Sequence, residues 1–134
     1  MKQTLLFLAI IILSSCSPKQ EKIAESQSIN IGKAKIEFST LNFDFGTIKQ
    51  GEEIIISFDF KNIGDAPLII YKVEPSCGCT VSKYPREPIK IGENGKINLI
   101  FKSAGFYGYQ IKTAKVYTNT QDSIITLTIH GYVE

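Results

Sequence analysis

The sequence Glu-Ile-Ile-Ile-Ser-Phe-Asp-Phe-Lys at residues 53–61 decides the fold class. Every second side chain in this stretch is apolar: Ile54, Ile56, Phe58 and Phe60. The positions between them are mostly polar: Ile55, Ser57, Asp59 and Lys61. A period of two places alternate side chains on opposite faces of an extended chain, with one face buried and the other in water. Residues 53–61 therefore predict a half-buried β-strand.

Strand-like segments lie on both sides of this stretch. Residues 62–67 read Asn-Ile-Gly-Asp-Ala-Pro and are rich in turn-forming residues, so the chain is expected to reverse there. The next strand is expected at residues 68–73, which lead directly into a pair of cysteines. Upstream, residues 35–38 and 41–45 alternate in the same way, the second segment ending before Gly46.

Downstream of the cysteines, two prolines interrupt the chain before a short apolar segment at residues 89–91. The dipeptide Asn94-Gly95 predicts a type I′ hairpin turn, because both residues tolerate a positive φ. Apolar and polar residues alternate again at residues 97–102.

Two further strands are expected near the C-terminus, at residues 113–119 and 123–133. No window shows helical spacing over ten residues. Around seven short strands in about 100 residues match the scale of an immunoglobulin-like β-sandwich. The chain has no tryptophan and lacks the usual immunoglobulin disulfide. The predicted fold is therefore an all-β, immunoglobulin-like sandwich without the antibody signature.

The first residues have the layout of a secretory signal. One lysine precedes nine apolar residues, and two small residues and Cys16 follow. A membrane-spanning helix needs roughly 20 apolar residues, so this run is too short to anchor the protein by itself. We expect a lipoprotein signal peptide at residues 1–15, a lipidated N-terminus and flexible polar tether at 16–30, and the sandwich domain at 31–134.

The sequence Leu13-Ser14-Ser15-Cys16 resembles a bacterial lipobox. The resemblance implies that Cys16 becomes the new N-terminus and carries a diacylglyceryl thioether, with an acyl chain such as palmitate on its amine. Each buried methylene contributes about 0.8 kcal/mol, and stable anchoring takes more than one chain. Ser17 suggests sorting to the outer membrane and leaves open which face the domain occupies. The alternative is an ordinary signal peptide in which Cys16 has no role.

Composition and motifs argue against several classes of function. The net charge of +2 is weak and no basic cluster is visible, so no nucleic-acid partner is expected. The tripeptide Asp44-Phe45-Gly46 matches a kinase motif, but the other kinase motifs are missing, so it is interpreted as a strand end. His130 is a lone histidine expected on the polar face of the last strand. With no complete catalytic constellation, we expect neither an enzyme nor a small-molecule substrate, and no cofactor besides the lipid.

Three segments carry a resemblance to a known family. Residues 43–52, 60–68 and 75–80 occur in the right order, the last reading Pro-Ser-Cys-Gly-Cys-Thr. Together they resemble the bacterial domain-of-unknown-function family 1573, common among lipoproteins of the Bacteroidota. The chain is similar, more distantly, to the Ig-like modules of major sperm protein and ciliary proteins. The resemblance covers nearly the whole mature domain and implies a fold, a location and a cysteine pair, with no established activity.

Cys77 and Cys79 are the chemically most unusual residues, and three interpretations of them stay open. In the first they form a disulfide or redox pair across Gly78, which suits an exported protein. Same-face residues of an extended strand lie about 6.6 Å apart, so such a bridge requires a tight turn at Gly78. Closing so short a loop contributes only roughly 1.5 kcal/mol of loop entropy, which indicates a labile bond rather than a structural one.

In the second interpretation Cys77 and Cys79 bind a soft metal such as Cu(I), although no further ligands are evident for a closed site. In the third they are small buried residues that pack one end of the sandwich. Separately, Asp122-Ser123-Ile124 resembles an O-glycosylation acceptor of the Bacteroidota and falls in an expected turn, which makes Ser123 a candidate modification site.

Two functional hypotheses follow. The first is a membrane-tethered, non-catalytic Ig-like module for binding or scaffolding in the cell envelope, with a protein partner that pairs with an edge strand. The second is a thiol-active envelope protein that uses Cys77 and Cys79 for redox chemistry or Cu(I) handling.

Overall fold

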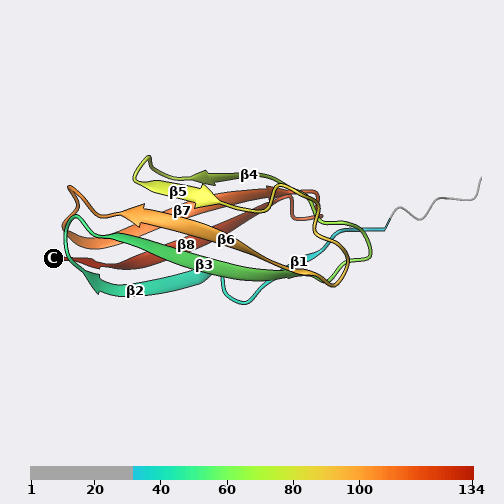
Figure 1. The fold of residues 1–134 in the computed structure, drawn as a ribbon, viewed down its shortest axis with the longest axis horizontal. Coiled ribbons are helices and arrows are strands. Elements are labelled where there is room, and N and C mark those ends of the chain that lie inside the picture. Colours follow the sequence, from blue (N-terminus) through green and yellow to red (C-terminus); the bar gives the residue numbers. More distant parts are fainter. Residues whose placement is uncertain (1–31) are drawn as a thin grey trace, which may run out of the picture.

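The structure is a computed structural model that describes residues 32–134, and throughout this range the regular structure is β-strand. The elements in chain order are β1 (Ile36–Phe38), β2 (Asn42–Ile48), β3 (Glu53–Asn62), β4 (Ile70–Pro75), β5 (Thr80–Lys83), β6 (Asn94–Lys102), β7 (Gly108–Thr118) and β8 (Ile124–Val133). Figure 1 shows them as an elongated sandwich with the C-terminus at one end and the first described residues entering at the other. The predicted all-β sandwich is confirmed, with eight strands in place of about seven.

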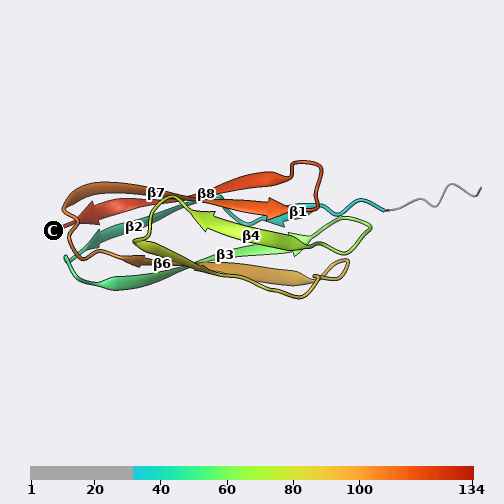
Figure 2. The same ribbon diagram turned by 90° about the horizontal axis from the view of Figure 1, so that it is seen from above.

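Two four-stranded sheets form the layers, which Figure 2 shows from above. One sheet has the order β1-β3-β6-β5 and the other the order β2-β8-β7-β4. Neighbouring strands are antiparallel, except that β2 pairs with β8 in parallel. The chain passes between the sheets five times: from β1 to β2, β2 to β3, β3 to β4, β4 to β5 and β6 to β7. The crossovers from β1 to β2 and from β4 to β5 join edge strands, and each closes one side of the sandwich.

The alternating pattern of β3 places its phenylalanines in the core. Phe58 and Phe60 are buried, whereas Ile55 on the opposite face is 66% exposed. The other layer contributes the inward-facing side chains Ala114, Val116, Leu127 and Ile129, all fully buried. Burial of a large apolar side chain contributes about 1.5–3 kcal/mol, so this interface between the layers supplies the main stabilising term.

The prediction of a hairpin turn at Asn94-Gly95 is wrong. Both residues lie within β6, and the positive φ that a turn requires occurs at Gly92, at 78°. Gly95 pairs with Phe60 across the sheet, and a Cβ at Gly95 would overlap the ring of Phe60. Gly95 therefore provides room for an aromatic ring. In the sequence, this packing requirement gives the same Asn-Gly dipeptide that a hairpin turn favours.

The segment between the cysteines and β6 contains little regular structure. Residues 89–91 form a single bridge, between Leu68 and Ile89, and the edge strand is β5 instead. The tripeptide Asp44-Phe45-Gly46 lies inside β2, at a shift of register against β8, and not at its end. Gly46 has a φ of 69° there, and its N–H donates to the carboxylate of Asp44.

The expected leader at residues 1–15, the lipidation site Cys16 and the tether at 16–30 lie outside the described residues. Within residues 32–134, no helix has the length and apolar character needed to cross a membrane.

Candidate functional site

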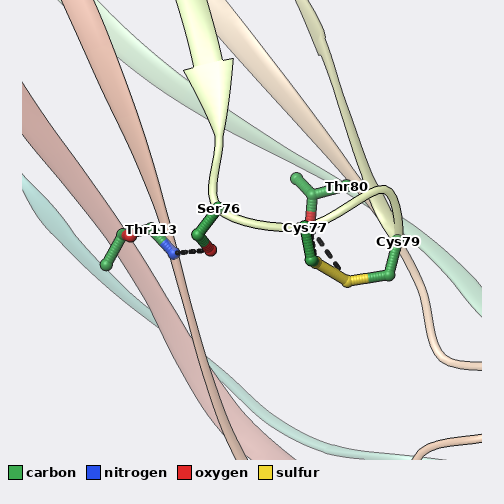
Figure 3. The surroundings of a disulfide bond; sticks show 5 residues. All are labelled: Ser76, Cys77, Cys79, Thr80 and Thr113. Carbon is green, nitrogen blue, oxygen red and sulfur yellow. Dashed lines mark hydrogen bonds between the residues drawn. A yellow bond between two sulfur atoms is a disulfide. The ribbon is translucent and has the colours of Figure 1, made fainter.

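Cys77 and Cys79 lie in the crossover from β4 to β5 and are joined by a disulfide (Figure 3). Their Cα atoms are 5.2 Å apart, shorter than the spacing of same-face residues on an extended strand. The chain achieves this with a turn in which the N–H of Thr80 donates to the carbonyl of Cys77 at 3.2 Å. The disulfide therefore sits where the chain passes from one sheet to the other.

Gly78 is exposed at the tip of this turn. A Cβ at Gly78 would meet no atom within 4 Å, and its φ is not among the positive values. The turn therefore does not depend on the conformational freedom of glycine, and the space beside its tip is open.

Backbone hydrogen bonds hold both ends of the cysteine loop. Before it, Ser76 and Thr113 of β7 are joined twice: the N–H of Ser76 donates to the carbonyl of Thr113 at 2.8 Å, and the N–H of Thr113 donates to Oγ of Ser76 at 3.1 Å. After it, the N–H of Lys102 donates to the carbonyl of Cys79 at 3.0 Å. None of these bonds involves sulfur, so they position the two cysteines independently of the disulfide.

The two sulfur atoms differ in their surroundings. Both cysteines are half-buried, but Cys79 packs against the hydrophobic core and Cys77 lies outside that cluster. The hydroxyl of the buried Thr80 lies 3.8 Å from each Sγ, within reach of a weak hydrogen bond to sulfur (Figure 3). A threonine hydroxyl can donate to either sulfur when that sulfur becomes a thiolate.

Neither metal binding nor nucleophilic catalysis by the two cysteines gains supporting residues in the described part of the chain. Among the residues described, no group of three or more histidines, cysteines or acidic residues is placed to hold a metal ion, and the Cu(I) interpretation stays a prediction. His130 lies on the outer face of β8, where Nδ1 is 3.2 Å from the hydroxyl of Tyr109 and 3.9 Å from the carboxylate of Asp44.

The outer face of β7 and β8 carries a second feature, which the sequence reasoning missed. Tyr109 pairs with Tyr132, and Ile111 pairs with His130, so four side chains form one block near the C-terminus. Tyr109 is 60% exposed, Ile111 59% and Tyr132 46%. We call these four residues the tyrosine patch. Large apolar residues at outward positions of adjacent strands were the signal that could have revealed it.

Two of the four edge strands are short, and each of the other two has a backbone group that is already hydrogen-bonded. The hydroxyl of Thr40 donates to the carbonyl of Asn42 at 2.7 Å and accepts from its N–H at 3.2 Å, at the start of edge strand β2. On edge strand β4, the carbonyl of Val73 accepts from Oγ of Ser82 at 3.1 Å. The remaining edges, β1 and β5, are three and four residues long. Blocked or short edges are a common protection against strand addition.

An exposed ionic network lies beside the cysteine loop on the outer face. Lys72 donates to the carboxylate of Glu74 at 2.7 Å, and the hydroxyl of Tyr117 donates to it at 2.9 Å. These hydrogen bonds, from Lys72 and then from Tyr117, lower the pKa of Glu74 below its usual value. The hydrogen bond to Glu74 raises the pKa of Lys72 and that of Tyr117.

Ser123 lies in the exposed turn between β7 and β8, and its carbonyl accepts from the N–H of Thr118 at 2.9 Å. A sugar on its hydroxyl remains a prediction, which the intact mass of the natively produced protein tests.

A family model described as "Protein of unknown function (DUF1573)" matches residues 36–133. No curated protein matches the sequence significantly. Among solved structures, a protein of unknown function from Porphyromonas gingivalis W83 is similar with a TM-score of 0.67 and 16% identity. The similarity covers 75% of this chain and 47% of that one, so the chain spans about half of its length.

Two further structures share the fold. The ASH / PapD-like domain of human CEP192 matches with a TM-score of 0.58 and 10% identity, covering 98% of both chains. The secreted serine protease VesC from Vibrio cholerae matches with a TM-score of 0.54 and 7% identity, covering 75% of this chain and 23% of the protease. At these identities the likeness concerns the fold alone, which is an Ig-like sandwich.

Proposed function

This chain belongs to the DUF1573 family, and on that premise we propose that it is a membrane-tethered, non-catalytic Ig-like binding module of the bacterial cell envelope. The observation that carries the proposal is the tyrosine patch, together with the lipobox-like sequence that ends at Cys16. The occupant we propose for the patch is the surface of another envelope protein.

The composition and size of the tyrosine patch support a protein partner. Tyrosine supplies a large rigid contact area at low entropic cost and is enriched in protein interfaces. With about 200 Å² for a fully exposed tyrosine and slightly less for isoleucine, the exposed fractions leave roughly 300 Å² of contiguous surface. Patches of about 300–600 Å² on a monomer are often functional. The patch would therefore form the centre of an interface of about 800 Å² per partner.

Charge also favours a protein surface over a charged ligand. The exposed tyrosine and isoleucine side chains are neutral, and Asp44 and the imidazole of His130 lie beside them. Such a surface complements another uncharged, partly apolar surface and offers no cluster for phosphate or nucleic acid.

The hydrogen bonds at the edges of the sheets favour the outer face of β7 and β8, rather than an edge strand, as the contact surface. Thr40 and Ser82 already satisfy backbone groups of β2 and β4 that a pairing strand would use. Pairing of a partner with an edge strand stays a prediction, and the tyrosine patch is the contact surface we propose.

The position of the tyrosine patch suits a tethered protein. Val133 at the end of β8 pairs with Gly108 at the start of β7, so the patch lies at the C-terminal end of the sandwich. The first described residues enter at the other end of the long axis (Figure 1). A lipid on Cys16 would thus place the patch at the end of the domain farther from the point of attachment.

Site-specific photo-crosslinking in cells that express the full-length lipoprotein tests the binding role. A photoreactive residue replaces Ile111 in the patch or, as the matched control, Ile55, which is exposed on the outer face of the opposite sheet. We expect one defined crosslinked protein from position 111 and none from position 55, and we expect Tyr132→Ser to abolish the adduct. Equal adducts at both positions, or no adduct at position 111, would refute the proposed surface.

The tether has its own test. Cys16→Ser removes the sulfur that would carry the lipid, so the variant is expected to leave the detergent phase in detergent partitioning and to lose the acyl mass by mass spectrometry. A wild-type protein without acyl mass would refute the lipid anchor. The binding role of the tyrosine patch is tested separately, by crosslinking.

A further inference from the structure

We propose that the bond between Cys77 and Cys79 is an exchangeable disulfide that accepts two electrons from an exported protein dithiol. The proposal does not rest on the binding role, because it uses a different part of the molecule. It rests on the size of the loop, its independent anchoring, its open tip and the hydroxyl beside both sulfurs.

The disulfide links residues only two positions apart. A cross-link stabilises a protein mainly by restricting the unfolded chain, and the effect shrinks with the length of the closed loop. A bond that closes so short a loop therefore contributes little to folding. The hydrogen bonds of Ser76 with Thr113 and of Lys102 with Cys79 tie the loop to both sheets without it. Reduction is thus expected to leave the fold in place and to leave two thiols facing one another.

Both cysteines are half-buried, but their surroundings differ in a way that favours attack at Cys77. Cys79 packs against the hydrophobic core, whereas Cys77 lies outside it, and the space beside Gly78 is open. A partner thiolate attacks Sγ of Cys77, and a new disulfide forms between the partner and Cys77 as the bond to Cys79 breaks. The electron pair of the broken bond leaves with Cys79 as a thiolate.

Thr80 is the positioning residue for this leaving group. Its buried hydroxyl lies 3.8 Å from each sulfur and can donate to the thiolate of Cys79 as it forms. Stabilising a leaving thiolate speeds thiol–disulfide exchange. The second thiol of the partner then attacks the partner's own sulfur in the mixed disulfide, which releases Cys77. The partner ends as a disulfide, and this chain gains two electrons and two protons as two thiols.

The first experiment equilibrates the detergent-solubilised full-length lipoprotein in glutathione buffers of graded ratio. Free thiols are trapped with a maleimide of defined mass, and the fold is followed by circular dichroism. We expect conversion from no to two trapped thiols within the range of the glutathione buffers, with the β-sheet spectrum unchanged. A bond that stays closed until the protein is denatured, or a domain that unfolds on reduction, would overturn the proposal.

Single variants test the order of attack. Cys79→Ser leaves Cys77 free, and Cys77→Ser leaves Cys79 free. We expect the thiol of Cys79→Ser to react with an aromatic disulfide reagent several-fold faster than that of Cys77→Ser. Equal rates in two folded variants would overturn the assignment of Cys77 as the attacked sulfur.

Thr80→Val keeps the shape of the side chain and removes the hydroxyl. We expect reduction by dithiothreitol to slow several-fold in this variant and to recover in Thr80→Ser. An unchanged rate in the valine variant would remove the role of Thr80. If the valine variant does not fold, the rates of reduction in Thr80→Ser and Thr80→Ala are compared instead. A slower rate in Thr80→Ala supports the role of the hydroxyl, and equal rates remove it.

Discussion

Replacing Asn62 by alanine is expected to destabilise the domain more than any exposed substitution. The fully buried side chain donates from Nδ2 to the carbonyls of Ala66, at 2.9 Å, and Ile89, at 3.0 Å. Its Oδ1 accepts from the N–H of Gly64 at 3.0 Å. In Asn62→Ala the carbonyl of Ala66 and the N–H of Gly64 lose this partner, whereas the carbonyl of Ile89 still accepts from the N–H of Leu68. Each buried polar group left without a partner costs about 1–3 kcal/mol. Allowing for relaxation of the loops, the expected loss is about 3–5 kcal/mol, a large part of the about 5–15 kcal/mol that stabilises a domain.

Urea unfolding of the purified protein, followed by circular dichroism, measures this loss by linear extrapolation. In thermal unfolding it corresponds to a decrease in Tm of about 12 °C or more. Asn98→Ala is the matched control, because Asn98 accepts one exposed hydrogen bond from Ser57 on the outer face of the sheet. The control is expected to lose less than about 1 kcal/mol. If both variants lose the same amount, or Asn62→Ala loses less than about 1 kcal/mol, the assignment of Asn62 as the anchor of these loops is wrong.

Two further outcomes are expected. Gly95→Ala should lower the free energy of unfolding by about 1–3 kcal/mol in thermal unfolding, because the new Cβ would overlap an aromatic ring. Gly78→Ala, the control, should change it by less than about 0.5 kcal/mol. Equal losses in the two variants would refute the packing argument. The pKa of Glu74, lowered by Lys72 and Tyr117, should rise in Tyr117→Phe when followed by NMR. Because the pKa of Glu74 is lower in the folded state, its ionised carboxylate stabilises the fold slightly above the unfolded-state pKa. This stabilisation is lost as the pH falls through the folded-state pKa. An unchanged pKa of Glu74 in Tyr117→Phe would contradict the assignment.

The periodicity of the sequence predicted most of the strands because alternation depends only on which side chains are apolar. Residues 53–61 are enough to identify β3 and its buried face, since a strand that slips by one residue would expose Phe58 and Phe60. The same reasoning could not place β5. Its residues Thr80–Lys83 are few; it pairs with β6 of one sheet, and its Ser82 donates to the carbonyl of Val73 in the other.

The candidate sites, too, were only partly predictable from the sequence. The sequence identified Cys77 and Cys79 by their chemistry, but the hydroxyl of Thr80 and the anchoring to Thr113 depend on strands that are distant in the chain. The tyrosine patch requires the pairing of β7 with β8, because Tyr109 and Tyr132 become neighbours only through that register.

The sequence by itself determined that this protein has an all-β domain with an unusual cysteine pair, because these features follow from local alternation and local chemistry. Tertiary structure alone decided which glycine makes room for a ring, which strand borders the disulfide and which tyrosines share a face. Those outcomes depend on cross-strand register between segments far apart in the chain, and a pattern that reports only each strand's own two faces does not contain that register.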